Sequence, residues 1–156
     1  IRDDLVTGVQ TCALPIYLIS RPICKSSLMS LVKDQLDIVY REIKEVFRKQ
    51  FDHVAFGINT YWSDKDEIQS VAHAGFLPEG CEDFAIACRH RCDDLNLNTR
   101  LGICLTELGD GHLVLECEGW ILDNRKEWVM RLEDVPYHWI SFSGYKRGGP
   151  WCEMNY

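Results

Sequence analysis

The hydrophobic period of this 156-residue chain changes at about Arg100, and this change constrains the fold more than any other feature. Before it, apolar residues recur at helical spacing. After it, they alternate at every second position, as in strands that bury one face. Tight turns such as Glu118-Gly119 separate the alternating runs. Helices followed by sequential strands predict an α+β fold in which N-terminal helices pack on an antiparallel sheet.

Two helices are predicted before the change of period. Ser26 or Ser27 caps the first, which runs to about Lys49. Its apolar face is formed by Leu28, Leu31, Val32, Leu36, Val39, Ile43, Val46 and Phe47. Residues 59–80 are predicted to form a connector. The second helix begins at Cys81 and ends at about Leu95.

The strands are predicted over residues 101–105, 112–117, 120–124, 128–130 and 139–143, and Trp151 is expected to close the sheet. The two-residue turn at Glu118-Gly119 sets the register of one hairpin. It pairs Val114 with Asp123, which makes His112 and Asp123 diagonal neighbours on one face. Their Cα atoms are expected roughly 7–8 Å apart, within reach of a side-chain hydrogen bond. The residues that alternate with these along the two strands point into a core on the opposite face.

Cys81 follows a proline-glycine loop and opens a predicted helix, which is a position that activates thiols. A helix N-terminus and a neighbouring imidazolium both lower a cysteine pKa. With His112 as the base and Asp123 as the residue that orients it, the three residues form a plausible catalytic triad. Backbone amides at the start of the helix are expected to supply one oxyanion donor, and residues 59–62 a second.

The composition excludes some classes of protein. Acidic residues outnumber basic ones by 24 to 17, which argues against a nucleic-acid surface. No run of about 18 apolar residues predicts a membrane span. The eight cysteines lie mostly among apolar residues, so they are interpreted as buried thiols of a reducing, cytoplasmic compartment rather than as disulfides of a secreted protein.

Residues 6–16 resemble the translation of a sequencing adapter. Residues 1–16 are therefore expected not to be native, and residues 17–156 to form a single domain. The alternative is an ordinary flexible N-terminus.

Three sequence blocks resemble the signature blocks of the bacterial transglutaminase-like cysteine proteinases. They are Cys81-Glu82-Asp83-Phe84-Ala85-Ile86-Ala87, Gly111-His112-Leu113-Val114-Leu115 and Ile121-Leu122-Asp123-Asn124. The resemblance runs from about residue 58 to residue 123. It implies a papain/transglutaminase-like fold with Cys81 as nucleophile, His112 as base and Asp123 as the orienting residue.

The sequence departs from the family at Gly80, where an acidic residue usually precedes the cysteine. In the periplasmic adhesin-cleaving members, acids flanking the nucleophile bind calcium. Glu82 and Asp83 are present, but calcium usually takes 6–8 oxygen ligands, so no metal and no cofactor are expected here. Zinc at Cys88, His90 and Cys92 is disfavoured, because His90 points away from the two cysteines on a helix.

These features predict a cysteine hydrolase that cleaves a peptide or isopeptide bond through a thioester. Its substrate would be a protein, a peptide or a peptidoglycan cross-link. The alternatives are an acyl transferase of the transglutaminase type and an inactive binding module on the same fold. His53, His73 and His138 are interpreted as ordinary surface or loop residues, and residues 146–149 as a flexible turn.

Overall fold

The structure is a computed structural model that describes residues 25–49, 64–68, 76–77, 80–145 and 147–154. The chain divides into two compact units, Ile1–Val32 and Lys33–Tyr156. In the first unit, the described residues are the opening turns of helix α2 (Lys25–Lys49). Residues 1–16, which resemble an adapter, lie outside the described residues. The prediction of one domain over residues 17–156 therefore stays a prediction.

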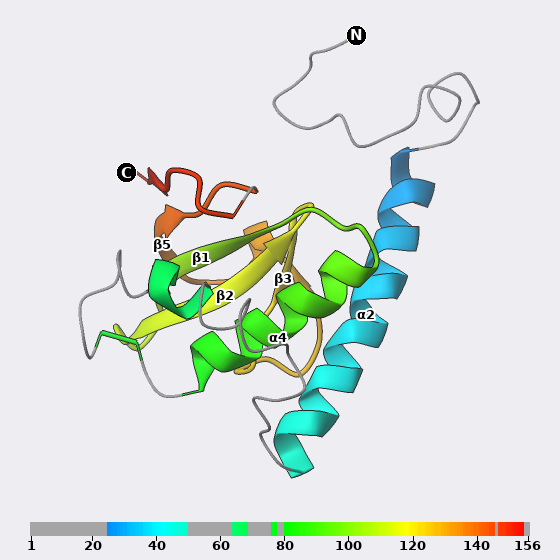
Figure 1. Cartoon of the computed structure of the whole chain (residues 1–156), viewed down its shortest axis with the longest axis horizontal. Helices are drawn as coiled ribbons and strands as arrows, with labels where there is room; N and C mark the ends of the chain where they lie inside the picture. The colour runs from blue at the N-terminus through cyan, green and yellow to red at the C-terminus, as the bar shows by residue number, and fades with distance from the viewer. Residues whose placement is uncertain (1–24, 50–63, 69–75, 78–79, 146, 155–156) are drawn as a thin grey trace, which may run out of the picture. The chain divides into compact units, whose positions relative to one another are not determined.

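The second unit is built around a six-stranded sheet with the order β4-β3-β2-β1-β5-β6 (Figure 1). Every neighbouring pair of strands is antiparallel. The strands are β1 (Thr99–Leu105), β2 (Gly111–Cys117), β3 (Trp120–Leu122), β4 (Met130–Arg131), β5 (His138–Phe142) and β6 (Cys152–Glu153). A short 3₁₀ helix, η3 (Leu132–Asp134), follows β4.

The β2–β3 hairpin has the register that the sequence predicts. Cys117 pairs with Trp120 and Leu115 with Leu122. Glu118 and Gly119 have φ values of 50° and 91°. Two left-handed residues are what a type I′ turn requires, and this turn matches the twist of the strands that it joins. The hairpin is therefore fixed by local chemistry.

Helix α4 (Cys81–Asp94) packs on one face of the sheet, mainly against β2 and also against β1 (Figure 1). It begins at the predicted residue and ends one residue before the predicted end. Gly80 precedes it with φ 96°, a left-handed conformation that glycine adopts at little cost. The part of helix α2 that belongs to the second unit lies beside α4, where Tyr40 and Phe47 contact the ring of Phe84 edge-on.

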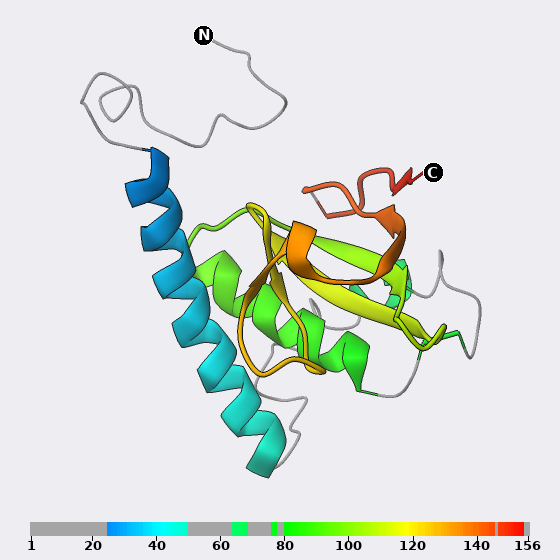
Figure 2. The same ribbon diagram turned by 180° about the vertical axis from the view of Figure 1, so that it is seen from behind.

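The opposite face of the sheet is also buried, which the alternation in the sequence did not predict. Its core consists of Cys104, Val114, Ile121, Val135, Tyr137, Trp139 and Phe142. A register shift between Ile103 and Cys104 brings both Trp139 and Phe142 onto this face. Figure 2 shows the segment between β4 and β5, in orange, on the side of the sheet away from α4. The sheet therefore lies between α4 on one face and the segment between β4 and β5 on the other.

Several predicted boundaries were wrong. Helix α2 begins at Lys25, so neither Ser26 nor Ser27 caps it. Strand β3 ends at Leu122 rather than at Asn124, and the strand predicted at residues 128–130 is shifted to Met130–Arg131, with Trp128 exposed. Residues 64–68, predicted as part of a connector, are helical. Each error concerns a segment of only a few residues, in which periodicity carries little information. Within the described residues, no helix is both long and apolar enough to cross a membrane.

Candidate active site

The imidazole of His112 and the carboxylate of Asp123 lie side by side in the interior. The distance between His112 Nε2 and Asp123 Oδ1 is 2.7 Å, and each residue is only 1% exposed. His112 is the second residue of β2, and Asp123 follows the last residue of β3. The contact predicted from the hairpin register is therefore confirmed. The Nδ1 atom of His112 is buried and has no hydrogen-bond partner among the described residues.

Asp123 accepts two further hydrogen bonds. The hydroxyl of Tyr137 donates to Oδ2 at 2.5 Å, and the backbone N–H of Arg125 donates to Oδ1 at 2.9 Å. Burial raises the pKa of the carboxyl group. The hydrogen bond and charge of His112, followed by the bonds from Tyr137 and Arg125, outweigh burial and lower the pKa below its usual value. Asp123 is therefore a carboxylate at neutral pH.

Tyr137 and Arg125 extend this network and were missed by the sequence analysis. One guanidinium nitrogen of Arg125 donates to the Tyr137 hydroxyl at 2.7 Å, and the other donates to Glu107 at 2.9 Å. The Tyr137 ring also meets the His112 ring edge-on, at 5.7 Å between centroids. Tyr137 lies in irregular chain between η3 and β5, where periodicity gives no signal.

Cys81 is the first residue of α4 and is 2% exposed. Its sulfur receives hydrogen bonds from the backbone N–H groups of Leu113 and Glu82. Strand β3 pairs with β2 only from Leu115 onward, so the edge of β2 beside His112 and Leu113 is not covered by β3. The helix thus places the Cys81 thiol against the residue that follows His112.

The pKa of Cys81 differs from the sequence-based expectation of a lowered value. Burial raises the pKa of the thiol to about 11, and the charges of Glu82 and Asp123 add to the rise. The hydrogen bonds from Leu113 and Glu82 oppose the rise but do not cancel it. In this conformation, Cys81 is a protonated thiol at neutral pH.

The start of α4 also directs backbone N–H groups outward. The N–H of Phe84 donates to Gly80 O at 3.1 Å, and the N–H groups before Phe84 lie too early in the helix to reach a carbonyl of its own turns. Such donors suit a developing oxyanion. Residues 59–62, expected to supply a second donor, lie outside the described residues.

The two acids that follow Cys81 are paired with a lysine. Lys65 Nζ lies 3.2 Å from Glu82 Oε1 and 3.1 Å from Asp83 Oδ1. Burial opposes the charge of Lys65, but its hydrogen bonds and charge interactions with Asp83 and Glu82 prevail and raise its pKa. No sequence signal links residue 65 to these acids, because Glu82 lies 17 positions further along the chain.

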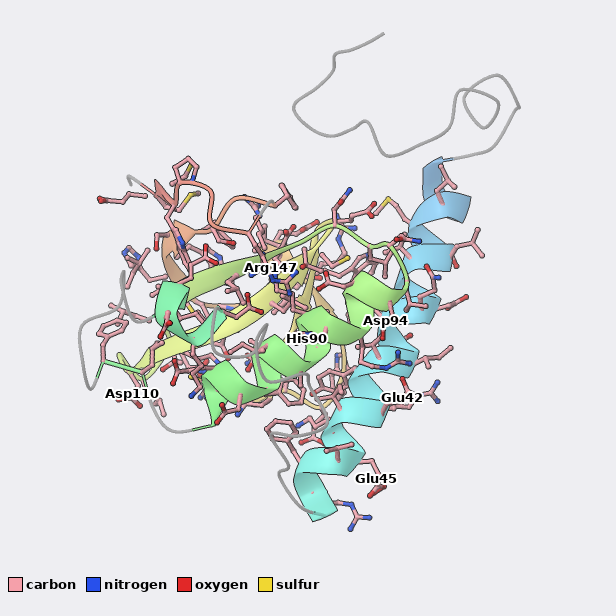
Figure 3. The ribbon with its side chains drawn as sticks, in the orientation of Figure 1. Glu42, Glu45, His90, Asp94, Asp110 and Arg147 are labelled. Carbon is pink, nitrogen blue, oxygen red and sulfur yellow. The ribbon has the colours of Figure 1, made fainter. Side chains whose placement is uncertain are left out.

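A second polar cluster surrounds Asp64 on the outer side of α4. Arg147 donates to the two Asp64 oxygens at 2.8 and 3.2 Å, and His90 Nε2 lies 3.9 Å away (Figure 3). Arg147 also pairs with Asp93 at 2.7 Å, so the turn predicted to be flexible is anchored. The guanidinium of Arg89 is buried in this cluster, 3.8 Å from Asp64, and makes no hydrogen bond to any residue that the structure describes.

The other predicted residues are dispersed. Cys88 and Cys92 are buried, and Cys92 shares a hydrogen bond with the Cys117 thiol on β2, so Cys92 packs against the sheet. Among the described residues, no group of three or more His, Cys, Asp or Glu could hold a metal ion. His138 is exposed at the start of β5. His53 and His73 lie outside the described residues.

No protein-family model matches the sequence, and no curated protein matches it. Among solved structures, the fold is similar to that of EGTA-treated LapG from Legionella pneumophila. That likeness has 16% identity and a TM-score of 0.52, and it covers 80% of this chain and 68% of LapG. For calcium-bound LapG, the corresponding values are 17%, 0.47, 72% and 65%. The first likeness confirms the predicted α+β, transglutaminase-like fold.

Proposed function

We propose that this chain is a cysteine hydrolase that cleaves an amide bond through a thioester on Cys81. The observation that carries the proposal is the state of the His112 ring. Its Nε2 atom is engaged by the Asp123 carboxylate, and its buried Nδ1 atom has no described partner. The resemblance of the three sequence blocks to transglutaminase-like cysteine proteinases supports the same assignment.

The Asp123 carboxylate selects the tautomer of His112. A carboxylate can only accept hydrogen bonds, so the neutral ring carries its proton on Nε2 and donates a hydrogen bond to Asp123. The other nitrogen, Nδ1, then holds a lone pair and can act as a base. His112 also lies next to Leu113, whose N–H contacts the Cys81 sulfur. The contact of Cys81 with Leu113 supports the assignment of Cys81 as the nucleophile and of the neighbouring His112 as its base.

In the acylation step, His112 Nδ1 takes the proton of the Cys81 thiol while the sulfur attacks the carbonyl carbon of the substrate. A carbon–sulfur bond forms and the carbon–nitrogen bond breaks. The leaving amine takes the proton from His112. The N–H groups at the start of α4 stabilise the oxyanion that forms on the carbonyl oxygen.

In the deacylation step, water attacks the thioester and gives a proton to His112 Nδ1. The carbon–sulfur bond breaks, the product leaves as a carboxylic acid, and the proton returns to Cys81. Because the resting thiol has a pKa of about 11, proton transfer to His112 accompanies attack rather than preceding it. Attack also requires that neighbouring atoms move, since Cys81 is 2% exposed.

The proposal is tested with a casein peptide mixture incubated with the protein in water labelled with heavy oxygen. Hydrolysis would place heavy oxygen in the new carboxyl termini, detected by mass spectrometry. Hydroxylamine would release the acyl group from Cys81 as a hydroxamate. Both signals should vanish in Cys81→Ala and persist in Cys152→Ala, which removes an exposed thiol.

Other outcomes would change the assignment. If Cys81→Ala and the wild-type protein introduced equal amounts of heavy oxygen into the peptides, Cys81 would not be the nucleophile. Adducts formed only when methylamine is added would identify an acyl transferase. If neither product nor an acyl group on Cys81 appeared, the hydrolase proposal would be rejected in favour of an inactive module.

A further inference from the structure

Lys65 places a positive charge between the two acids that follow the proposed nucleophile. Its Nζ lies 3.2 Å from Glu82 and 3.1 Å from Asp83, and the three side chains are only 15–17% exposed. Adjacent carboxylates in a first helical turn repel each other. One ammonium group donates to both and balances one of the two negative charges.

The residues around Lys65 hold it in place. Asp64, the preceding residue, is fully buried and accepts two hydrogen bonds from Arg147. Trp151 Nε1 donates to Glu67 at 3.0 Å. The helical segment 64–68 is therefore tied to the C-terminal part of the chain at two points. Figure 3 labels Arg147, which comes from this part of the chain. The lysine is built into the site and is not a surface residue that happens to lie near it.

A calcium ion, which the family resemblance implies at these acids, does not fit this donor set. Calcium needs 6–8 oxygen ligands at about 2.3–2.6 Å. Gly80 contributes no side chain, and the ammonium already occupies the space between Glu82 and Asp83. The described residues contain no group of three or more His, Cys, Asp or Glu that could hold a metal ion. The residues present therefore suit the ammonium group of a lysine, which carries a single charge and is part of the chain.

We propose that Lys65 is a built-in cation that replaces a metal ion at the first turn of α4. By pairing with Glu82 and Asp83, it fixes this turn and positions Cys81. The role of Lys65 in turnover rests on the proposed hydrolase function, whereas its role in the turn does not. Lys65 is a positioning residue, because it contacts the acids and not the reacting atoms.

The test compares Lys65→Met, Lys65→Arg and, as the control, Lys33→Met. Lys33 also pairs with an acid, Asp37 at 2.8 Å, but the two side chains are 37% and 34% exposed. Melting temperatures are measured in millimolar calcium and in EGTA. The wild-type protein should melt at the same temperature in both. Lys65→Met should melt about 2–4 °C lower, and Lys65→Arg and Lys33→Met close to wild type.

A double-mutant cycle and a labelling rate complete the test. In a Glu82→Gln/Asp83→Asn background, Lys65→Met should lower the melting temperature little, because the partners of Lys65 are already neutral. The rate at which iodoacetamide labels Cys81 should change in Lys65→Met and return in Lys65→Arg. These readouts need no substrate, so an inactive wild-type protein would remove only the hydrolase proposal. A rise in the wild-type melting temperature with calcium would overturn the inference about Lys65. The inference would also be overturned if Lys65→Met lowered the melting temperature as much in the Glu82→Gln/Asp83→Asn background as in the wild type. An unaltered rate of Cys81 labelling would overturn it too.

Discussion

The Nε2 atom of His112 and the Oδ1 atom of Asp123 are 2.7 Å apart across the β2–β3 hairpin, in a site closed to solvent. Strand β2 provides the histidine, and the chain directly after β3 provides the aspartate. Because the turn between them is tight and both strands are short, the relative position of the two side chains is a property of the hairpin. This makes the pair a good subject for mutation.

Asp123→Asn should reduce turnover by about 10³–10⁴-fold, because an amide at this position can stabilise the wrong tautomer of His112. The free energy of unfolding should fall by only about 1–3 kcal/mol. Turnover of the casein peptides and urea denaturation measure the two effects. Asp134→Asn, at an exposed position in η3, is the control. Unchanged turnover would contradict the orienting role of Asp123.

The same variant should change how stability depends on pH. The pKa of Asp123 is lowered in the folded protein, so its contribution to stability is present above its unfolded pKa of 3.8. It is lost as the pH falls through the lower, folded value. Wild-type protein should therefore lose more stability than Asp123→Asn on acidification below about pH 5. If stability fell in parallel with pH in the two proteins, the Asp123 carboxylate would contribute nothing to the pH dependence of stability.

Alkylation of Cys81 should accelerate about tenfold per pH unit between about pH 7 and pH 10, because burial raises its pKa to about 11. The sequence places Cys81 at a position that activates thiols, but the structure shows that Cys152 is exposed. Labelling is therefore measured in a Cys152→Ser background. Cys104, also buried, serves as an internal control that should stay unlabelled. A rate independent of pH in this range would indicate a thiolate–imidazolium pair already formed at rest.

Tyr137→Phe should lower turnover about tenfold and the free energy of unfolding by about 1.5–3 kcal/mol, since it removes a hydrogen bond to a charged group. The pKa of Asp123 should rise, so the acid limb of the pH–activity profile should move to higher pH. Tyr145→Phe is the matched control, because the Tyr145 hydroxyl contacts Glu116 at a long 3.4 Å. Equal effects of the two substitutions would argue against a specific role for Tyr137.

The parts of the site that the sequence predicted are those set by short-range rules. A two-residue turn and the strict alternation of strands place His112 beside Asp123, and a glycine-preceded helix begins at Cys81. Tyr137 could not be predicted in this way. It reaches Asp123 from irregular chain, across a sheet whose register shift also brings Trp139 onto the same face. Such a contact depends on the whole fold.

Electrostatics was harder to predict than position. The sequence indicated a lowered pKa for Cys81 from its place at a helix start, and the structure confirms that place. However, alternation in β2 suggested one buried face, whereas every residue of this strand is buried. Desolvation of the Cys81 thiol then outweighs the backbone hydrogen bonds that lower its pKa. The depth of a residue depends on both layers that cover the sheet, and no single strand encodes it.

Gly111→Ala should be more destabilising than Gly102→Ala, although both glycines lie in adjacent strands. A Cβ at Gly111 would lie 2.2 Å from the backbone oxygen of Phe76, which cannot turn aside. A Cβ at Gly102 would lie 2.7 Å from the ring of Phe142, which is a side chain that can adjust. We expect losses of about 3 and about 1 kcal/mol in the free energy of unfolding, measured by urea denaturation.

The two substitutions should also differ in their effect on turnover. Gly111 precedes His112, so displacement of this strand end moves the proposed base relative to Cys81, and misplacement by about 1 Å can cost roughly a hundredfold in rate. Gly102 lies on β1, opposite Val114, and its replacement should leave the rate of the folded protein nearly unchanged. Turnover is compared per mole of folded protein at a temperature well below both melting transitions. A larger loss for Gly102→Ala in either measurement would show that the contact between Gly111 and Phe76 does not fix the start of β2.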